Sequence, residues 1–249
     1  MQFEQVLGVR FINVPIAETI EYIFQVRGYT VAPAAPAFAN IQRDQEYRRA
    51  LLEADTAIAD SGFMVLLWYL LRGRRLVRNS GLRYLQTFLE TAPADSRIYL
   101  ILPTESAREK ALCYFSGQKL KLARTDTYVA PIYQGRVSDE KLISVLNLGR
   151  PDHVIVALGG GTQEKLGLHL RDRLAYRPAI HCVGAALGFL TGDQQPIPMW
   201  IDRVYLGWLL RLICHPRRYA RRFSRAFELP GLILRYGRET PSLKVESRS

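Results

Sequence analysis

The sequence predicts an α/β fold with a mostly parallel β-sheet flanked by helices, followed by a helical, arginine-rich carboxyl-terminal appendage. Short apolar or β-branched segments at 98–102, 154–158 and 180–184 end at turn residues, and helical stretches separate them. This alternation is typical of parallel strands covered by helices. It stops near residue 195, where arginines begin to accumulate. We therefore expect an α/β catalytic domain over 1–195 and a helical basic appendage over 196–249.

The amino-terminal segment is expected to contain a hairpin, a helix and a buried strand. Residues 6–15 alternate well enough for a strand or hairpin, and apolar residues of 16–26 recur at helical spacing. Residues 30–33 fit a short buried strand that leads into a loop at 34–36.

The next elements bring an acidic residue to the end of a strand. Residues 38–54 show roughly helical spacing, and the run 56–59 predicts a strand that delivers Asp60 at its carboxyl end. An apolar helix follows and is expected to end at Gly73. Gly81 then marks a turn before a helix at 82–90.

Composition, cysteine content and the first residues predict an unexported globular protein. Its 249 residues, 48% of them apolar, can bury a full core. Three scattered cysteines do not form a disulfide framework, so a reducing compartment fits best. The first residues lack a signal peptide pattern, and the longest apolar run, 63–71, is far shorter than the roughly 18 residues that span a bilayer.

Positive charge is concentrated near the carboxyl end. The net charge is +11, and the segment 203–227 contains no acidic residue but seven arginines: 203, 211, 217, 218, 221, 222 and 225. Such a run is often only a solvated face, but together with nearby aromatic residues it suits an anionic membrane surface or a diphosphate. Phosphodiesters would suit it too, but no recognised nucleic-acid-binding motif is present, so no nucleic-acid partner is expected.

Asp60 is the first candidate for chemistry. Ligands of open α/β sheets bind beyond the carboxyl ends of the strands, so a carboxylate there can meet a substrate. The alternative is that Asp60 caps the helix that follows it.

The second candidate is the glycine-rich segment Gly159, Gly160 and Gly161, which leaves a strand and precedes Gln163. Glycines let backbone amides approach a ligand, and a helix amino terminus attracts phosphate. The segment lacks the last glycine of a dinucleotide-binding fingerprint. A plain tight turn is the alternative.

Other catalytic patterns are absent from the sequence. The four histidines show no metal-binding spacing, and His181, inside an apolar strand, is expected to be a core residue. There is no nucleophile elbow, no phosphate-binding Walker loop and no Asp-x-Asp pair to hold a nucleotide-sugar metal. Neither a metal nor a cofactor is expected.

Four ordered segments together resemble the WecG/TagA/CpsF glycosyltransferases, and the resemblance runs from about residue 6 to residue 225. The matching segments are 48–55 with 60–62, 151–159 with Gln163 and Glu164, 183–186 with Gly192, and 206–212 with 215–218.

The resemblance implies a Rossmann-like fold and the inverting transfer of a sugar, often N-acetylmannosamine. The implied donor is a UDP-sugar and the implied acceptor is a polyprenyl-diphosphate-linked sugar. It also implies cell-surface or exopolysaccharide synthesis, a cytoplasmic location peripheral to the inner face of the plasma membrane, and self-association, which family members commonly show.

The resemblance also assigns roles to individual residues. Asp60 aligns with the proposed catalytic base, Gln163 with a substrate-contacting glutamine, and Arg78 with an arginine before a glycine turn. Arg211, Arg218 and Arg222 align with arginines of a membrane-targeting appendage that completes the site. The implied substrate-binding positions further include Ala32, Ala34, Gly159, Gly160, Gly161 and Gly184.

The chain departs from the family pattern at several of these positions. Ala32 and Ala34 stand where the family has Thr and Asn, which removes two side chains able to bind a sugar hydroxyl. Losing a hydroxyl-recognising group alters specificity strongly. The sequence therefore favours an active enzyme with an altered sugar choice. The alternative is a catalytically impaired relative that binds lipid-linked glycan as a pathway scaffold.

Overall fold

The computed structural model describes residues 1–134, 136–184, 186–192 and 224–244. Its centre is an eight-stranded sheet in the order β1-β2-β4-β3-β8-β7-β5-β6. Only the edge pair β1–β2 is antiparallel, which confirms the mostly parallel α/β fold. The strands are β1 (Phe3–Val6), β2 (Val9–Ile12), β3 (Gly28–Val31), β4 (Thr56–Ala57), β5 (Ile98–Leu102), β6 (Thr127–Val129), β7 (His153–Val156) and β8 (Ala179–Cys182).

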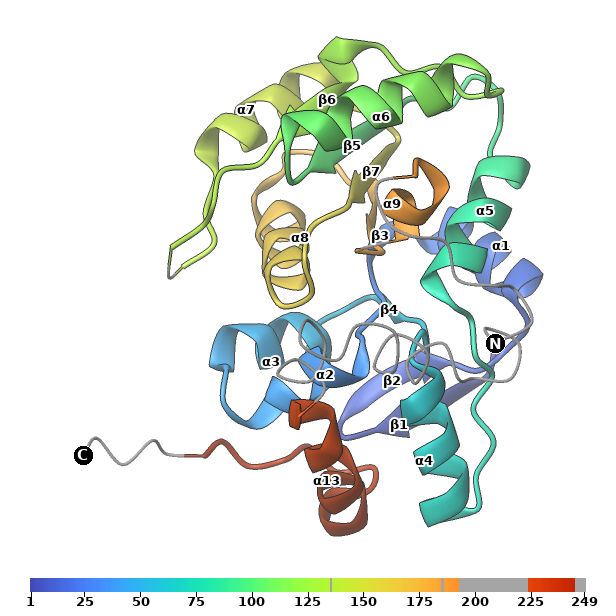
Figure 1. Ribbon diagram of the computed structural model, residues 1–249, viewed down its shortest axis with the longest axis vertical. Helices are drawn as coiled ribbons and strands as arrows, with labels where there is room; N and C mark the ends of the chain where they lie inside the picture. The colour runs from blue at the N-terminus through green and yellow to red at the C-terminus, as the bar shows by residue number, and fades with distance from the viewer. Residues whose placement is uncertain (135, 185, 193–223, 245–249) are drawn as a thin grey trace.

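Helices cover both faces of the sheet (Figure 1). The first face packs against α2 (Ala35–Phe38), α3 (Gln45–Leu52), α4 (Gly62–Arg72), α7 (Glu140–Gly149), α8 (Thr162–Arg173) and α13 (Leu229–Tyr236). The second packs against α1 (Ile16–Val26), α5 (Gly81–Thr91), α6 (Glu105–Ser116) and α9 (Ala186–Leu190). Short 3₁₀ helices lie at η1 (Ala39–Gln42), η2 (Arg124–Asp126) and η3 (Ser224–Glu228).

Alternate residues of each central strand enter different cores. In β5, Tyr99 and Ile101 pack on the first face, whereas Leu100 and Leu102 pack on the second. Every residue of β5 is buried, as expected for a strand with helices on both sides. The continuous apolar run that predicted this strand is therefore a consequence of its two covered faces.

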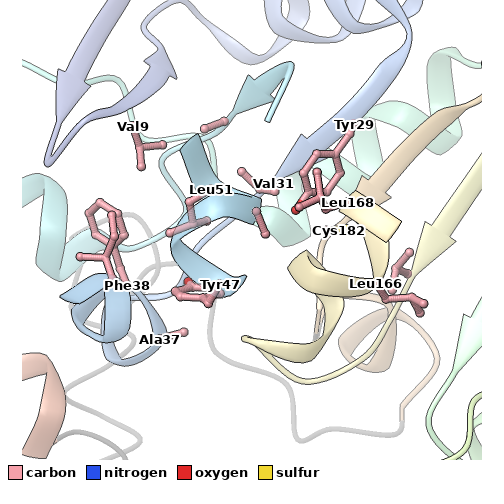
Figure 2. Packing of buried hydrophobic residues seen from close by; sticks show 14 of the residues in the cluster. Val9, Tyr29, Val31, Ala37, Phe38, Tyr47, Leu51, Leu166, Leu168 and Cys182 are labelled. Atoms are coloured by element: carbon pink, nitrogen blue, oxygen red, sulfur yellow. The ribbon is translucent and has the colours of Figure 1, made fainter. Parts of the chain in front are cut away.

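The first core lies between the middle of the sheet and helices α2, α3 and α8 (Figure 2). Phe11 and Phe38 meet edge to face, with ring centroids 5.8 Å apart. Tyr29, fully buried in β3, donates its hydroxyl hydrogen bond to the backbone oxygen of Glu164 in α8, at 2.5 Å. This bond satisfies the buried hydroxyl and ties α8 to the centre of the sheet.

Several elements form where the sequence predicts them. The helix 16–26 and the strand 98–102 have the predicted bounds, and the amino-terminal hairpin is β1–β2. Ser61 accepts the amide hydrogen bond of Met64 at the start of α4, and Gly73 ends the helix in the left-handed conformation. These boundaries depend on local capping groups, which a sequence displays directly.

Other predictions of local structure were wrong. The loop expected at 34–36 contains the start of α2, and the single helix expected over 38–54 is divided into η1 and α3. The second helix starts afresh because Asp44 caps it, accepting from the amide of Tyr47 at 2.9 Å. The strand β6 was missed, since its three residues are fixed by pairing with β5.

A buried polar trio lies on the second face of the sheet. The Tyr84 hydroxyl is 2.6 Å from His181 Nδ1, and His181 Nε2 is 3.1 Å from His153 Nδ1. His181 is fully buried, which confirms that it is a core residue. Burial lowers its pKa well below the ordinary value and lowers the pKa of His153 to about 4.

The described end of the predicted appendage packs against the α/β body. Leu229 and Ile233 of α13 belong to the first core, and α13 lies beside α4 (Figure 1). Backbone amides of Leu7 and Gly8 donate to the oxygens of Gly237 and Arg238. The predicted boundary at 195/196 lies outside the described residues, so the domain division stays a prediction. No helix in the described part of the chain is long and apolar enough to cross a membrane.

Candidate active site

Asp60 follows β4, and three hydrogen bonds hold Asp60 and its neighbour Ala59 against residues 78–81 at the start of α5. Its carboxylate Oδ1 accepts from the backbone amide of Gly81 at 2.7 Å, and its backbone oxygen accepts from Arg78 Nε at 3.0 Å. The amide of Asn79 donates to the oxygen of Ala59 at 3.2 Å. The half-buried carboxylate is thus held at the amino terminus of α5, where the helix dipole favours negative charge.

The interpretation of Asp60 as the cap of the next helix was wrong. Ser61 caps α4, as described above, whereas Asp60 reaches the first residue of α5, 21 positions away. The local signal for an N-cap was therefore real but belonged to the neighbouring serine. Asp60 instead connects two elements that the sequence does not link.

Asn79 fixes the segment between α4 and α5 to the amino-terminal part of the chain. Its side-chain amide donates to the backbone oxygen of Val14 at 3.0 Å and to the hydroxyl of Thr19 at 3.1 Å. Asn79 is only 2% exposed, so these bonds form away from water, where an unpaired amide would be costly. Asn79 therefore fixes the position of the loop that holds Asp60.

The glycine segment forms the turn between β7 and α8. Gly159 and Gly160 are exposed, and the amide of Gly161 donates to the carboxylate Oε2 of Glu164 at 2.6 Å. Glu164 is fully buried at the start of α8. Its bond to Gly161 is one half of a capping box, so this amide already has a partner within the protein. Phosphate binding by the turn stays a prediction, and it falls to the other amides.

Gln163 lies beside this turn with one polar atom unpaired. The side chain is 3% exposed and donates from Nε2 to the Oε1 of Glu164 at 3.0 Å. Its Oε1 is buried without a hydrogen-bond partner in the described structure. A buried unsatisfied oxygen costs about 1–3 kcal/mol, a feature that functional sites tolerate.

The end of β8 brings the acid and the glutamine together. A Cβ on Gly81 would lie 3.6 Å from Asp60 Oδ1 and 3.5 Å from the backbone oxygen of Val183. A Cβ on Gly184, whose φ is +58°, would lie 3.2 Å from Gln163 Oε1. Val183 and Gly184 are consecutive, so Asp60 and Gln163 flank the same strand end.

The order of the strands explains why Asp60 and Gln163 flank the same strand end. Strands β4, β3, β8 and β7 are neighbours and run parallel, so their carboxyl ends form one continuous edge. This edge carries Asp60 after β4, Ala32 after β3, Gly184 after β8 and Gly159 after β7. It is the place where open α/β sheets bind ligands.

The alanine segment after β3 belongs to the same edge. Ala32 is buried, and Ala34 is half-buried at the residue before α2. A Cβ on Gly160 would lie 3.4 Å from the Cβ of Ala37, so α2, which follows this segment, lies against the glycine turn. The two alanines therefore follow β3 at the sheet edge of the candidate site, and neither offers a polar side chain to a substrate.

Not every predicted site residue can be placed. Arg211, Arg218 and Arg222 lie outside the described residues. Conversely, the sequence interpretation missed the contributions of Asn79, Gly81 and Glu164. Glu164 could have been found, because a Glu three residues after a helix N-cap is the capping-box signature. For Gly81 no local signal exists.

Comparisons with known proteins match the chain to one family of glycosyltransferases. The family model described as "Glycosyl transferase WecG/TagA/CpsF family" matches residues 4–244. A protein of Bacillus subtilis (strain 168), named N-acetylglucosaminyldiphosphoundecaprenol N-acetyl-beta-D-mannosaminyltransferase, is 26% identical over 233 residues, which cover 90% of this chain and 88% of the relative. A protein of the same name from Bacillus spizizenii (strain ATCC 23059 / NRRL B-14472 / W23) is 22% identical over 214 residues, covering 82% and 78%.

Proposed function

Because the chain belongs to the WecG/TagA/CpsF family of glycosyltransferases, we propose that it moves a sugar from a UDP-sugar to a polyprenyl-diphosphate-linked acceptor. The acceptor class is supported by the two relatives, whose names specify an N-acetylglucosaminyl-diphosphoundecaprenol substrate. The pathway would be cell-surface or exopolysaccharide synthesis, at the cytoplasmic face of the membrane.

In the proposed reaction, Asp60 is the general base. The acceptor hydroxyl oxygen forms a bond to the anomeric carbon while the bond from that carbon to the UDP oxygen breaks. The hydroxyl proton passes to Asp60, and UDP leaves with the electron pair of the broken bond. Attack from the side opposite UDP inverts the anomeric configuration, and the carbon passes through an oxocarbenium-like state.

The leaving UDP needs positive partners, which the mechanism assigns without a bound metal. Arg78 is held beside Asp60, and the turn at Gly159 and Gly160 is exposed at the same sheet edge. The tail arginines, predicted from the sequence, would complete the neutralisation and bind the anionic membrane surface. One such electrostatic contact contributes roughly 3 kcal/mol to the stabilisation of a transition state.

One observation carries the proposal: Asp60 and Gln163 flank the end of β8. An acid that removes a proton and a buried amide that contacts the substrate can therefore act on one bound molecule. The alanines beside them support an altered choice of donor sugar, since a site without hydroxyl-binding groups selects sugars differently.

The test is sugar transfer from a panel of UDP-sugars to a polyprenyl-diphosphate-linked N-acetylglucosamine. The unaltered chain should transfer at least one sugar, and Asp60→Asn should lower the rate at least about a hundredfold, the usual scale for a lost general base. Asp95→Asn, which changes an exposed aspartate, is the matched control. Full activity of Asp60→Asn would remove Asp60 from the mechanism.

Ala32 and Ala34 also favour a second function, a scaffold that binds lipid-linked glycan without turnover. Equilibrium binding separates the two. Affinity for the acceptor together with no affinity for any nucleotide sugar would favour the scaffold, whereas turnover of any donor would reject it.

A further inference from the structure

Helix α4 presents an apolar stripe to the outside of the protein. Phe63, Met64 and Trp68 are buried on its inner side. On its outer side Leu66, Tyr69 and Leu70 are 39%, 50% and 65% exposed. These three positions follow i, i+3, i+4 spacing, so they form one stripe along the helix. A helix that is apolar all round is normally buried on every side, which makes an exposed apolar face here unusual.

The surroundings of this stripe are basic. The segment 61–89 contains no acidic residue, and Arg72, Arg74 and Arg75 follow the stripe directly. Arg72 donates to backbone oxygens at the end of α13, and Arg74 is 3.7 Å from Glu4. Arg75 is exposed. The stripe therefore ends in a cluster of cations.

Helix α13, which packs beside α4, adds residues of the same kinds (Figure 1). Leu234 is 58% exposed and Arg235 is exposed. Phe227, just before α13, is 57% exposed and meets Phe63 of α4 edge to face at 6.2 Å. The end of the molecule formed by α4 and α13 thus combines exposed apolar and arginine side chains.

We propose that this α4–α13 surface, defined by Leu66, Tyr69, Leu70, Leu234 and the arginines 72, 74, 75 and 235, docks on an anionic lipid bilayer. Apolar side chains enter the boundary of headgroups and acyl chains, while arginines contact anionic headgroups. Charge favours a membrane over a second copy of this chain. The carboxylate of Glu4, beside Arg74, is buried and also paired with Arg238, so a symmetric contact would bring mainly the exposed arginines of two copies together.

The α4–α13 surface lies near the candidate site. Its link to catalysis rests on the proposed function. Helix α4 begins two residues after Asp60, and Leu70 lies about 12 Å further along the helix by the usual rise of 1.5 Å per residue. A bilayer in contact with α4 would therefore lie near the proposed base, where the proposed function requires a lipid-linked acceptor to bind. The surface consists of residues other than Arg211, Arg218 and Arg222, the tail arginines implied by the resemblance.

The first experiment measures co-sedimentation of the full chain with vesicles of phosphatidylethanolamine and phosphatidylglycerol, and with vesicles of phosphatidylcholine alone. We expect binding to the anionic vesicles and at least tenfold weaker binding of the variant Tyr69→Ser with Leu70→Ser. The matched control is Ile132→Ser with Leu148→Ser. These residues are 91% and 90% exposed, and Leu148 belongs to α7, at the other end of the molecule (Figure 1). The control should bind like the unaltered chain.

A second measurement does not depend on loss of binding. The three native tryptophans set a background, which is measured in the unaltered chain. In Leu70→Trp, the added fluorescence should shift to shorter wavelength with anionic vesicles and be quenched by brominated lipid, whereas the fluorescence added in Leu148→Trp should show neither effect. Equal vesicle binding by the Tyr69/Leu70 variant and the unaltered chain, or no quenching of the fluorescence added in Leu70→Trp, would overturn the proposal. So would a dimer of the unaltered chain in sedimentation that the same variant abolishes.

The vesicle experiments and the transfer assay can fail separately, so failure of the docking surface can be told apart from failure of the proposed function. Transfer to a short-chain, water-soluble diphosphate acceptor should be unchanged in the Tyr69/Leu70 variant. If no donor is transferred by any form of the chain, the proposed function fails whatever the vesicles show. If transfer proceeds and vesicle binding is unaffected by the variant, only the docking surface is rejected.

Discussion

The Asp60 carboxylate accepts its hydrogen bond from the backbone amide of Gly81, the first residue of a helix that starts 21 positions later. The orientation of the proposed base is therefore set by a main-chain group. A side-chain substitution at Gly81 leaves this amide in place, whereas proline removes it. This difference allows the contact to be tested without altering Asp60.

We predict that Gly81→Pro lowers the rate of sugar transfer at least tenfold, while Gly81→Ala stays within about threefold, on the scale of one lost charge-assisted hydrogen bond. Proline is well tolerated at the first position of a helix, and Ser80 before it already has the extended backbone that proline requires. An alanine Cβ would meet neighbours only at 3.5 Å or more. Steady-state kinetics with circular dichroism of both variants checks this, and equal rates would contradict it.

Gly184 should be more sensitive to substitution than a glycine of similar backbone conformation in open space. Gly184→Ala adds a Cβ 3.2 Å from the Gln163 amide, whereas Gly73, with φ of +63°, has nothing within 4 Å. Both changes incur about 1–2 kcal/mol of backbone strain. Only Gly184→Ala adds overpacking, which typically costs about 1–3 kcal/mol more. Urea unfolding of the two variants measures the difference, and equal losses of stability would refute the contact.

The buried carboxylate of Glu164 should be needed to hold the glycine turn. Glu164→Gln places an amide N–H₂ group against one of two donors, the amide of Gly161 or Nε2 of Gln163, and should cost about 1–3 kcal/mol of stability. The amide of Gly161 should also exchange its hydrogen faster. Glu90→Gln, on an exposed residue, is the control for the charge change. Unchanged exchange at Gly161 would show that the bond does not order the turn.

The histidine pair should make the fold sensitive to mild acid. Burial holds the pKa of His153 at about 4, below its unfolded value of about 6.5, so the unfolded chain binds more protons in between. The stabilisation is fully present above pH 6.5 and is lost as the pH falls towards 4, by about 3 kcal/mol for His153. His181 acts in the same direction. Urea midpoints between pH 7 and pH 4 should fall less steeply for His153→Gln, and an unchanged slope would disprove the link.

The sequence by itself determined the elements whose signals are local. Helical spacing fixed α1, the apolar run fixed β5, and Ser61 and Gly73 marked the two ends of α4. It also predicted a ligand site at the sheet edge with Asp60 as a candidate, and the family resemblance added Gln163 to that prediction. Periodicity and capping involve residues within one or two turns of each other, so they are visible without knowledge of the fold.

Tertiary structure decided the arrangements that depend on distant partners. The three residues of β6 are a strand only because β5 pairs with them. The carboxylate of Asp60 accepts from the amide of Gly81 at the start of α5, a partner that no local pattern indicates. The contact of Gly184 with Gln163 requires β8 to lie beside β7 in the sheet. A hydrogen bond or a close packing contact acts over a few ångströms in space, and only the folded chain brings residues from separate elements within that range.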